Sequence, residues 1–160
     1  MARINNIIIK NARIMFRNFE GRESQYNRAG DRNFTVRIQD PDYAQELINE
    51  GWNVRIRPSR DPDEDSIYTL KVKAHYGRTS PDIRVFTSRN KEGRPLTEET
   101  VKELDDADLK KIDLEIRPYQ YEVAGRSGVS AYLKTLWCVL EEGPFAEDYE
   151  NYFAEEDEPF

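Results

Sequence analysis

The sequence predicts a mainly β protein with one folded body, and three observations carry this prediction. Apolar and polar residues alternate in short stretches through most of the chain, which is the pattern of strands that bury one face. Only two segments carry the start and stop signals of helices. A glycine-containing turn at residues 124–128 joins two long strand-like stretches. The length of 160 residues is that of one ordinary domain.

Five segments are expected to form strands with one buried and one solvent-facing side, and two further segments are also expected to be strands. In the first, the apolar residues Ala12, Ile14 and Phe16 should point inward. The last is apolar on both faces, so we expect it at the centre of the sheet. The expected strands are 12–17, 34–38, 52–57, 70–75, 83–86, 112–117 and 129–140.

Two short helices are expected between the strands. In the first, Asp40 is the N-cap, Pro41 occupies the first helical position and Gly51 ends the helix. In the second, Thr97 is the expected N-cap, and Val101 with Leu104 should face the core.

A long polar loop over residues 18–33 completes the predicted architecture. Short strands, small helices and a long first loop are typical of a small closed or nearly closed barrel. An OB-fold fits best, because it has five strands, a basic first loop and a long late hairpin. The predicted fold class is an OB-fold-like small β-barrel with one or two short helices and an acidic C-terminal tail; a β-sandwich is the alternative.

The charge of the chain is divided between two segments. The whole chain carries 24 basic and 31 acidic residues, a net charge of −7. Residues 141–160 hold nine of the acids and no Lys or Arg, so residues 1–140 carry a net charge of +2. We therefore expect a nucleic-acid-binding domain at 1–140 and an acidic partner-binding tail at 141–160.

The residue counts exclude several classes of protein. One cysteine, Cys138, cannot build a disulfide framework, and one histidine, His75, leaves most metal and triad chemistry without ligands. The acidic run 61–65 lacks the glycine and the late glutamate of a calcium-binding loop. The N-terminus shows no signal-peptide pattern. We expect a cytoplasmic protein without metal or cofactor, and not an enzyme.

Cations on the outward positions of the strands, with aromatic residues beside them, point to nucleic acid. Single strands are held by bases stacked on aromatic rings and by cations along the phosphates. The alternative is an ordinary solvated sheet face with core tyrosines; a core role is preferred for Phe34, Trp52 and Tyr68 and is open for Trp137. The candidate contacts are Arg13, Arg17, Phe19, Arg22, Tyr26, Arg28, Arg32, Arg37, Lys71, Lys73, Tyr76, Arg117, Tyr119, Tyr121, Arg126, Tyr132 and Lys134.

The C-terminus ends in acids, a proline and a terminal phenylalanine. Its expected partner-binding residues are Glu155, Glu156, Asp157, Glu158, Pro159 and Phe160. The ring and the terminal carboxylate of Phe160 would fit an apolar pocket with a basic rim, and the acids would steer the approach. The alternative is a plain acidic tail. The aromatic residues at 145, 149, 152 and 153 share one helical face, which favours a short helix packed on the barrel.

These features resemble a known family. The tip resembles the C-terminus of bacterial single-stranded DNA-binding (SSB) proteins, which ends in several Asp and Ile-Pro-Phe, although Glu158 stands where Ile would stand. Phage SSB proteins, whose acidic tails end in an aromatic residue, are similar. Segments 11–21, 26–34, 51–54, 113–119 and 131–135 look like a phage SSB family encoded in replication modules. The resemblance implies an OB-fold, sequence-independent ssDNA binding and partner docking through the tail.

The predicted function is a non-enzymatic ssDNA-binding protein. It would coat and protect single strands in phage DNA replication, recombination or repair, in the cytoplasm of an infected bacterium. Its tail would recruit replication or recombination proteins of phage or host, and a homo-oligomer is open. Two alternatives remain at this stage: an acidic-tailed interaction or DNA-mimic protein, and an RNA-binding OB protein.

Overall fold

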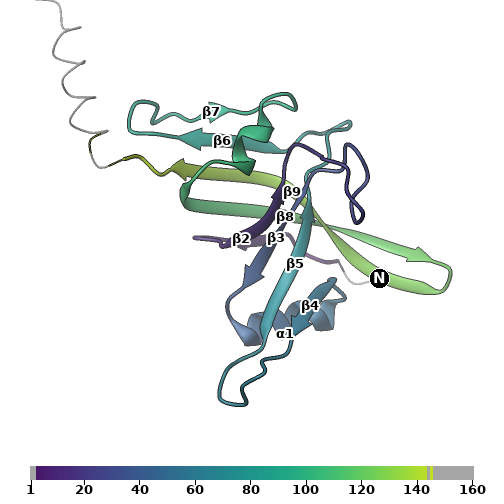
Figure 1. Ribbon diagram of the computed structural model, residues 1–160. Helices are drawn as coiled ribbons and strands as arrows, with labels where there is room; N and C mark the ends of the chain where they lie inside the picture. The colour runs from purple at the N-terminus through teal and green to yellow at the C-terminus, as the bar shows by residue number, and fades with distance from the viewer. Residues whose placement is uncertain (1–2, 144, 146–160) are drawn as a thin grey trace, which may run out of the picture.

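The structure, a computed structural model, describes residues 3–143 and 145 and is mainly β (Figure 1). The expected fold class is confirmed in this respect, with one α-helix and one short 3₁₀ helix among the strands of the described residues. The elements are β1 (Ile7–Ile9), β2 (Ile14–Asn18), β3 (Asn33–Ile38), α1 (Pro41–Glu50), β4 (Val54–Arg57), β5 (Ile67–Lys73), β6 (Asp82–Phe86), β7 (Arg94–Pro95), η1 (Val101–Asp105), β8 (Leu109–Val123) and β9 (Arg126–Leu140).

The strands form one sheet in the order β1-β8-β9-β5-β3-β2. β9 is central, as expected, because β8 pairs with one edge while β5 and β6 pair in parallel with the other. β1 and β2 stand at the two ends of the order, so no ladder of the described residues closes the sheet. β1 and β2 are consecutive in the chain, and the residues 10–13 that join them contact β8. There the Ala12 N–H donates to the Ile112 carbonyl at 2.8 Å.

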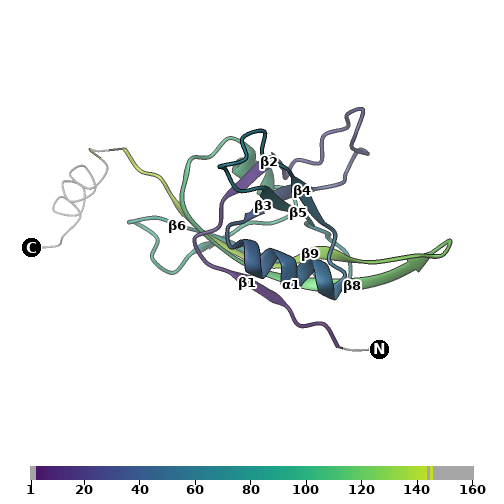
Figure 2. The ribbon, with the colours of Figure 1, turned by 90° about the horizontal axis from the view of Figure 1, so that it is seen from below.

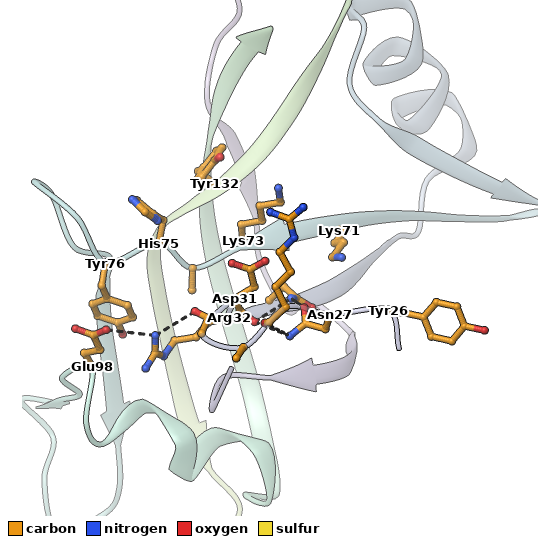
Figure 3. Close-up of a pocket in the computed structure, with 15 residues that line it drawn as sticks. Tyr26, Asn27, Asp31, Arg32, Lys71, Lys73, His75, Tyr76, Glu98 and Tyr132 are labelled. Atoms are coloured by element: carbon orange, nitrogen blue, oxygen red, sulfur yellow. Dashed lines mark hydrogen bonds and ion pairs between the residues drawn. The ribbon is translucent and has the colours of Figure 1, made fainter. Parts of the chain in front are cut away.

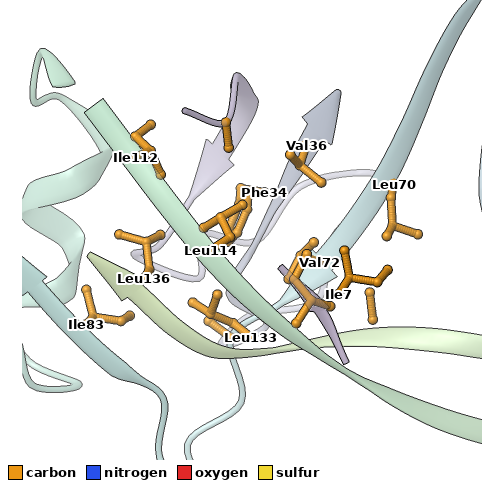
Figure 4. Close-up of a cluster of buried hydrophobic side chains, with 14 of the residues drawn as sticks. Ile7, Phe34, Val36, Leu70, Val72, Ile83, Ile112, Leu114, Leu133 and Leu136 are labelled. Atoms are coloured by element: carbon orange, nitrogen blue, oxygen red, sulfur yellow. The ribbon is translucent and has the colours of Figure 1, made fainter. Parts of the chain in front are cut away.

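One apolar core lies on the inner face of this sheet (Figure 4). No polar or charged residue of the described chain is fully buried. Trp52 and Cys138 are buried as expected, and burial raises the pKa of the Cys138 thiol to about 11. The central side chains are Ile7, Phe34, Val36, Leu70, Val72, Leu114, Ile116, Leu133 and Leu136. We call the opposite, solvent-facing side of the strands the outer face.

Helix α1 has the expected ends and covers the lower end of the sheet (Figures 1 and 2). The Asp40 carboxylate accepts the Asp42 N–H at 3.0 Å, and Gly51 ends the helix in the left-handed region with φ 100°. Within the described ranges, no helix is long and apolar enough to cross a membrane.

The second expected helix is only the five-residue 3₁₀ helix η1, and its N-cap is Thr100 rather than Thr97. The physical reason is a turn just before it, in which the Thr100 hydroxyl accepts the Thr97 N–H at 2.8 Å. The Thr97 carbonyl also accepts the N–H groups of Thr100 at 3.2 Å and Val101 at 2.9 Å, so Thr97 caps this turn and the 3₁₀ helix follows it.

β8 and β9 form a long hairpin that extends beyond the rest of the sheet (Figure 1). Its turn is tighter than expected, because residues 126–128 belong to β9 and only Ala124 and Gly125 form the loop. Both have positive φ, 52° and 77°, as a two-residue hairpin turn requires. β1 pairs with β8 only as far as Ile116, so the tip of the hairpin projects away from the core.

The expected inward alternation fails in β2 and at the end of β4. The register of β2 against β3 shifts between Met15 and Asn18. Phe16 there has φ 52° and is 79% exposed rather than buried. Ile56 is also exposed, and its strand begins at Val54 rather than at residue 52. An irregular residue changes which side chains face the core, so alternation is no longer a guide beyond it.

Candidate nucleic-acid interface

A polar hollow of about 590 Å³ lies between the long loop 19–32 and the outer face of β5 (Figure 3). The loop supplies one wall with residues 26–32. β5 and the residues that follow it supply the opposite wall, and β9 contributes Tyr132. The lining residues are 26–33, Lys71, Lys73, Ala74, His75, Tyr76, Glu98 and Tyr132.

The loop wall is folded around the side chain of Asn27. The Asn27 amide donates to the carbonyls of Arg22 (2.8 Å), Arg28 (3.1 Å) and Asp31 (3.0 Å). Its Oδ1 accepts from Asn33 Nδ2 at 2.8 Å. These bonds tie both sides of the loop to the start of β3, so the wall has a definite shape without a strand or helix of its own. Sequence reasoning did not single out Asn27; its only signal was an amide in a long polar loop.

Gly21 closes the same loop at its root. The Gly30 N–H donates to the Gly21 carbonyl at 2.8 Å. Gly21 has φ 75°, and a Cβ there would lie 3.0 Å from the Gly30 backbone. Only glycine meets both demands without strain.

Arg32 forms part of the wall of the hollow through contacts with Glu98 and Tyr76. Its Nη1 lies 3.3 Å from Glu98 Oε1, and its guanidinium lies 5.4 Å from the centre of the Tyr76 ring. The Arg32 side chain is only 18% exposed. Burial raises the pKa of Tyr76, while the nearby Arg32 charge acts in the opposite direction. The structure thus gives both residues a role in shaping the hollow.

Lys71 and Lys73 project from β5 into the hollow (Figure 3). They lie opposite Thr35 and Asn33 of β3 on the outer face, and both are exposed. Within residues 3–143 and 145, neither lysine has an ion-pair partner, and the same holds for Arg28 on the loop wall. These three cations are therefore available to an anionic ligand.

Tyr132 forms an aromatic platform beside these lysines, next to Lys73 in the parallel register of β5 and β9. Two rings pack against it at steep angles: Tyr119 at 5.7 Å between centroids and 69° between ring planes, and His75 at 6.4 Å and 86°. The guanidinium of Arg117 lies 6.0 Å from the centre of its ring. Sequence reasoning missed His75 as a contact, although it lies at the outward parity of Lys71 and Lys73.

The structure removes Phe19 from the candidate contacts. Phe19 is fully buried, and its ring stacks on Phe34 at 5.3 Å. The two bonds that Asp105 accepts from the backbone N–H groups of Phe19 (2.7 Å) and Glu20 (3.0 Å) hold this turn against η1. The prediction of Phe19 as a DNA contact is therefore wrong: it is a core residue displaced from the alternation by the β2 irregularity.

Other predicted cations lie away from the hollow. Arg13 and Arg17 line a second hollow, of about 470 Å³, between β2 and β8. Arg17 Nη1 donates to the carbonyls of Leu104 (2.8 Å) and Ala107 (2.7 Å). Arg22 pairs with Glu20 at 3.6 Å.

Three further candidates lie on the outer face or the hairpin. Lys134 pairs with Glu115 at 3.6 Å on the outer face of the hairpin. Arg37 lies on the outer face of β3, opposite Thr69. Arg126 is exposed at the start of β9, beside the hairpin turn.

Two predicted tyrosines take different positions. Tyr26 is 86% exposed and points out from the hollow rather than into it (Figure 3). The Tyr121 hydroxyl and the side chain of Asn53 share hydrogen bonds of 3.1 and 3.3 Å, which brace the hairpin against the segment before β4. Tyr119 and Tyr132 are therefore the predicted tyrosines that the structure brings together.

The predicted tail residues Glu155, Glu156, Asp157, Glu158, Pro159 and Phe160 lie outside the described residues, as does the expected helix except for Phe145. The last described residues leave the body at the end of β9. There the Glu142 carboxylate accepts the Ser88 N–H (2.9 Å) and hydroxyl (2.6 Å), which lowers the pKa of Glu142. No group of His, Cys, Asp and Glu in the described ranges is placed to hold a metal ion.

Comparison with known proteins places these features in a family. A family model described as "Putative phage ssDNA-binding domain" matches residues 1–158. The fold is similar to that of a single-stranded DNA-binding protein from bacteriophage Enc34 in complex with ssDNA, with 14% identity, 88% of this chain and 89% of that chain covered, and a TM-score of 0.56.

A C-terminal truncation of the Enc34 protein is similar at 15% identity, with 88% of each chain covered and a TM-score of 0.53. No curated protein matches the sequence. At these identities the solved structures support the OB-like fold.

Proposed function

Because the chain belongs to the phage ssDNA-binding domain family, which matches residues 1–158, we propose that it binds single-stranded DNA across the outer face of β5, β9 and β8. One observation carries the proposal: the Tyr132 platform stands directly beside Lys73 and the polar hollow. Single-strand binding uses cations and aromatic rings that a strand can reach, and here Lys73 has no ion-pair partner among the described residues, Tyr119 is exposed and Tyr132 is half-buried.

The proposed path assigns a task to each group. Phosphates would lie against Lys71, Lys73 and Arg28, whose charges are not neutralised within the described part of the chain. Bases would stack on the ring surfaces of Tyr132 and Tyr119. Neither contact reads a base edge, so the binding would be independent of sequence.

The platform favours single strands over duplexes. In a duplex the base faces are stacked on one another and cannot meet the ring of Tyr132, whereas an open strand presents them. A duplex would retain only its phosphate contacts with the lysines. The Enc34 protein, whose fold is similar, forms a complex with ssDNA, and this supports the same use of the fold here.

We propose finer roles as well, which the family and the charge pattern support. We place the protein in phage DNA replication, recombination or repair, in the cytoplasm of the infected bacterium, where it would coat and protect single strands without catalysis. We assign DNA binding to residues 1–140. The acidic segment 141–160, ending at Phe160, would recruit replication or recombination proteins.

Titration of the full-length chain with oligo-dT, oligo-U and a duplex of equal length tests the proposal. We expect tight oligo-dT binding, weaker duplex binding and a linear fall of log K with log salt, at about −0.7 for each phosphate neutralised. Equal affinity for duplex and single strand, or no response to salt, would contradict it. A preference for oligo-U would indicate an RNA-binding protein instead.

A further inference from the structure

Trp137 is an exposed aromatic residue that the proposed interface does not yet include. It lies on the outer face of β9 and is 43% exposed. Its indole N–H donates to Asp82 Oδ2 at 3.2 Å, and its ring lies 5.4 Å from the Arg84 guanidinium and 5.5 Å from the Phe86 ring. These contacts fix the ring while a large part of it remains in solvent.

An irregularity in β9 places Trp137 on this face. Leu133 is opposite Ile116, but Thr135 is opposite Glu115, so β9 has one extra residue between them. Without it, the alternation that buries Ala131 and Leu133 would also bury residue 137. The extra residue instead turns Leu136 and Cys138 inward, both at most 2% exposed, and leaves Trp137 outside.

A third hollow lies on the outer face between the Tyr132 platform and Trp137, and neither ring lines it. It has a volume of about 580 Å³, and its lining includes Arg117, Lys134 and Asp82. Arg117 at one end contacts the Tyr132 ring, and Asp82 at the other end holds the Trp137 indole. This stretch of the outer face, called the path below, therefore lies between one aromatic site and the other and adjoins each through one lining side chain.

The charges along this path are compatible with a polyanion. Its three flanking acids each face a cation: Glu115 with Lys134 at 3.6 Å, Asp82 with Arg84 at 3.0 Å, and Asp113, which lies opposite Trp137, with Lys111 at 3.7 Å. Arg117 adds a positive charge with no ion-pair partner among the described residues. Arg84, although paired with Asp82, lies against the tryptophan ring itself, so a cation stands beside the candidate stacking surface.

We infer that single-stranded DNA continues from Tyr132 along the outer face of β9 and stacks a base on Trp137. This inference rests on the proposed function and extends its footprint. Tyr132 and Trp137 lie opposite Arg117 and Asp113, which are four residues apart on β8, or about 13 Å at about 3.3 Å per residue. A short oligonucleotide on the Tyr132 platform would not span that distance, whereas a longer one would occupy both sites.

Variants of Trp137 test the inference in the full-length protein. Trp137→Ala and Trp137→Leu remove the ring, and we expect each to weaken binding of an oligo-dT of about 16 nucleotides by about 5- to 150-fold, the value of one stacked base. Trp137→Phe keeps a ring and should retain most of the affinity. Phe16→Ala, at an aromatic residue that is 79% exposed and lies off the path, should bind as the unmodified protein does.

Tryptophan fluorescence gives an independent measurement. Trp52 is 3% exposed, so Trp137 should account for quenching by oligo-dT, and Trp137→Phe should abolish that quenching. Unchanged affinity in folded Trp137→Ala and Trp137→Leu, or undiminished quenching in Trp137→Phe, would overturn the inference while ssDNA binding stands. Either result would mean that Trp137 and the side chains around it do not bind DNA and are open to another partner, such as a protein. An unmodified protein that binds no oligo-dT would overturn the proposed function and this inference together.

Discussion

At the scale of single residues, Tyr132 shows how a polar sheet face can hold a base without reading it. His75, Tyr119 and Arg117 all contact its ring, so the ring has little freedom to lose when a base stacks on it. Ordering a mobile side chain would cost about 0.5–1.5 kcal/mol on binding, and a ring already held avoids much of that cost. The neighbours of Tyr132 therefore contribute to affinity even where they do not touch DNA.

Substitution of Tyr132 should separate its ring from its hydroxyl. Tyr132→Ala should weaken ssDNA binding by about 1–3 kcal/mol, because a stacking surface is lost. Tyr132→Phe should leave affinity nearly unchanged, since ring stacking does not use the hydroxyl. Fluorescence anisotropy with labelled oligo-dT measures both, with circular dichroism as the check on folding. A folded Tyr132→Ala protein of full affinity would show that the platform is not used.

The two lysines of the hollow should account for part of the salt dependence. Lys71→Gln and Lys73→Gln should each reduce the slope of log K against log salt by about 0.7, if each lysine neutralises one phosphate. Lys10→Gln is the matched control, because Lys10 is exposed in the link between β1 and β2 and lines none of the hollows described above. Titration at a series of salt concentrations gives the slopes. The prediction fails if all three variants share the slope of the unmodified protein.

At the scale of elements, the loop 19–32 forms one wall of the interface, and the side-chain amide of Asn27 stabilises its shape. Asn27→Ala removes three donated bonds and one accepted bond, and a hydrogen bond contributes about 0.5–1.5 kcal/mol net. We expect a loss of about 1–3 kcal/mol in the free energy of unfolding and weaker ssDNA binding, because the wall loses its shape. Urea denaturation and oligo-dT titration measure the two effects.

Asn49→Ala is the control for Asn27. Asn49 is an exposed asparagine on α1 whose side chain accepts one bond, from Gln45 at 3.1 Å. This variant should change the free energy of unfolding by less than Asn27→Ala and should not change DNA affinity. If Asn27→Ala behaved in the same way, the amide would not be what shapes the wall.

The elements also show where sequence patterns are sufficient. Strict alternation correctly predicted the inward residues of β3 and β5, and local cap chemistry correctly predicted both ends of α1. The failures at Phe16 and Phe19 share one cause, because β2 contains an irregularity that shifts the alternation by one residue. A second irregularity, in β9, decides the position of Trp137, which the sequence left open. Such a shift depends on the pairing partner, which the sequence of one strand does not contain.

The candidate site was predictable only in its parts. Outward parity indicated Lys71 and Lys73, whereas Tyr132 was indicated separately, as an aromatic residue close to cations in the sequence. Their assembly depends on the parallel register of β5 and β9, which joins residues 73 and 132 across the sheet. The sequence likewise could not predict that Arg17 bonds to two backbone carbonyls or that Arg32 pairs with Glu98, because these partners are distant in the sequence.

At the scale of the whole molecule, the distribution of charge predicts competition between the acidic C-terminal segment and a DNA strand. Residues 1–140 carry a net charge of +2, whereas the last twenty residues carry nine acids. An acidic tail and a DNA strand would be attracted to the same cations, so they would compete for the interface. The bonds of Glu142 to Ser88 hold the start of the acidic segment against the body. The acids that follow belong to the same chain as the cations, so they would compete with DNA within one molecule.

Deletion of residues 145–160 should therefore tighten ssDNA binding. It removes seven acids and no base, so less negative charge competes with the phosphates. The gain should be largest at low salt, where the Debye length is about 30 Å at 0.01 M, and should shrink near 0.15 M, where it is about 8 Å. Oligo-dT titration at both salt concentrations measures the gain. Weaker binding after the deletion would instead mean that the tail helps to form the site.

Phe160→Ala separates competition for DNA from partner recruitment. It changes no charge, so DNA affinity should remain within the error of the titration at both salt concentrations. Capture of replication proteins should be lost, because a partner pocket that recognises this tip would need the terminal ring and carboxylate together. The paired measurement is oligo-dT titration and pull-down from infected-cell extract, with the full-length chain and the 145–160 deletion as references. Since the deletion also lacks the tip, both variants should fail to capture partners, while only the deletion should alter DNA binding. Partner capture by Phe160→Ala at the level of the full-length chain would show that the terminal ring is not recognised.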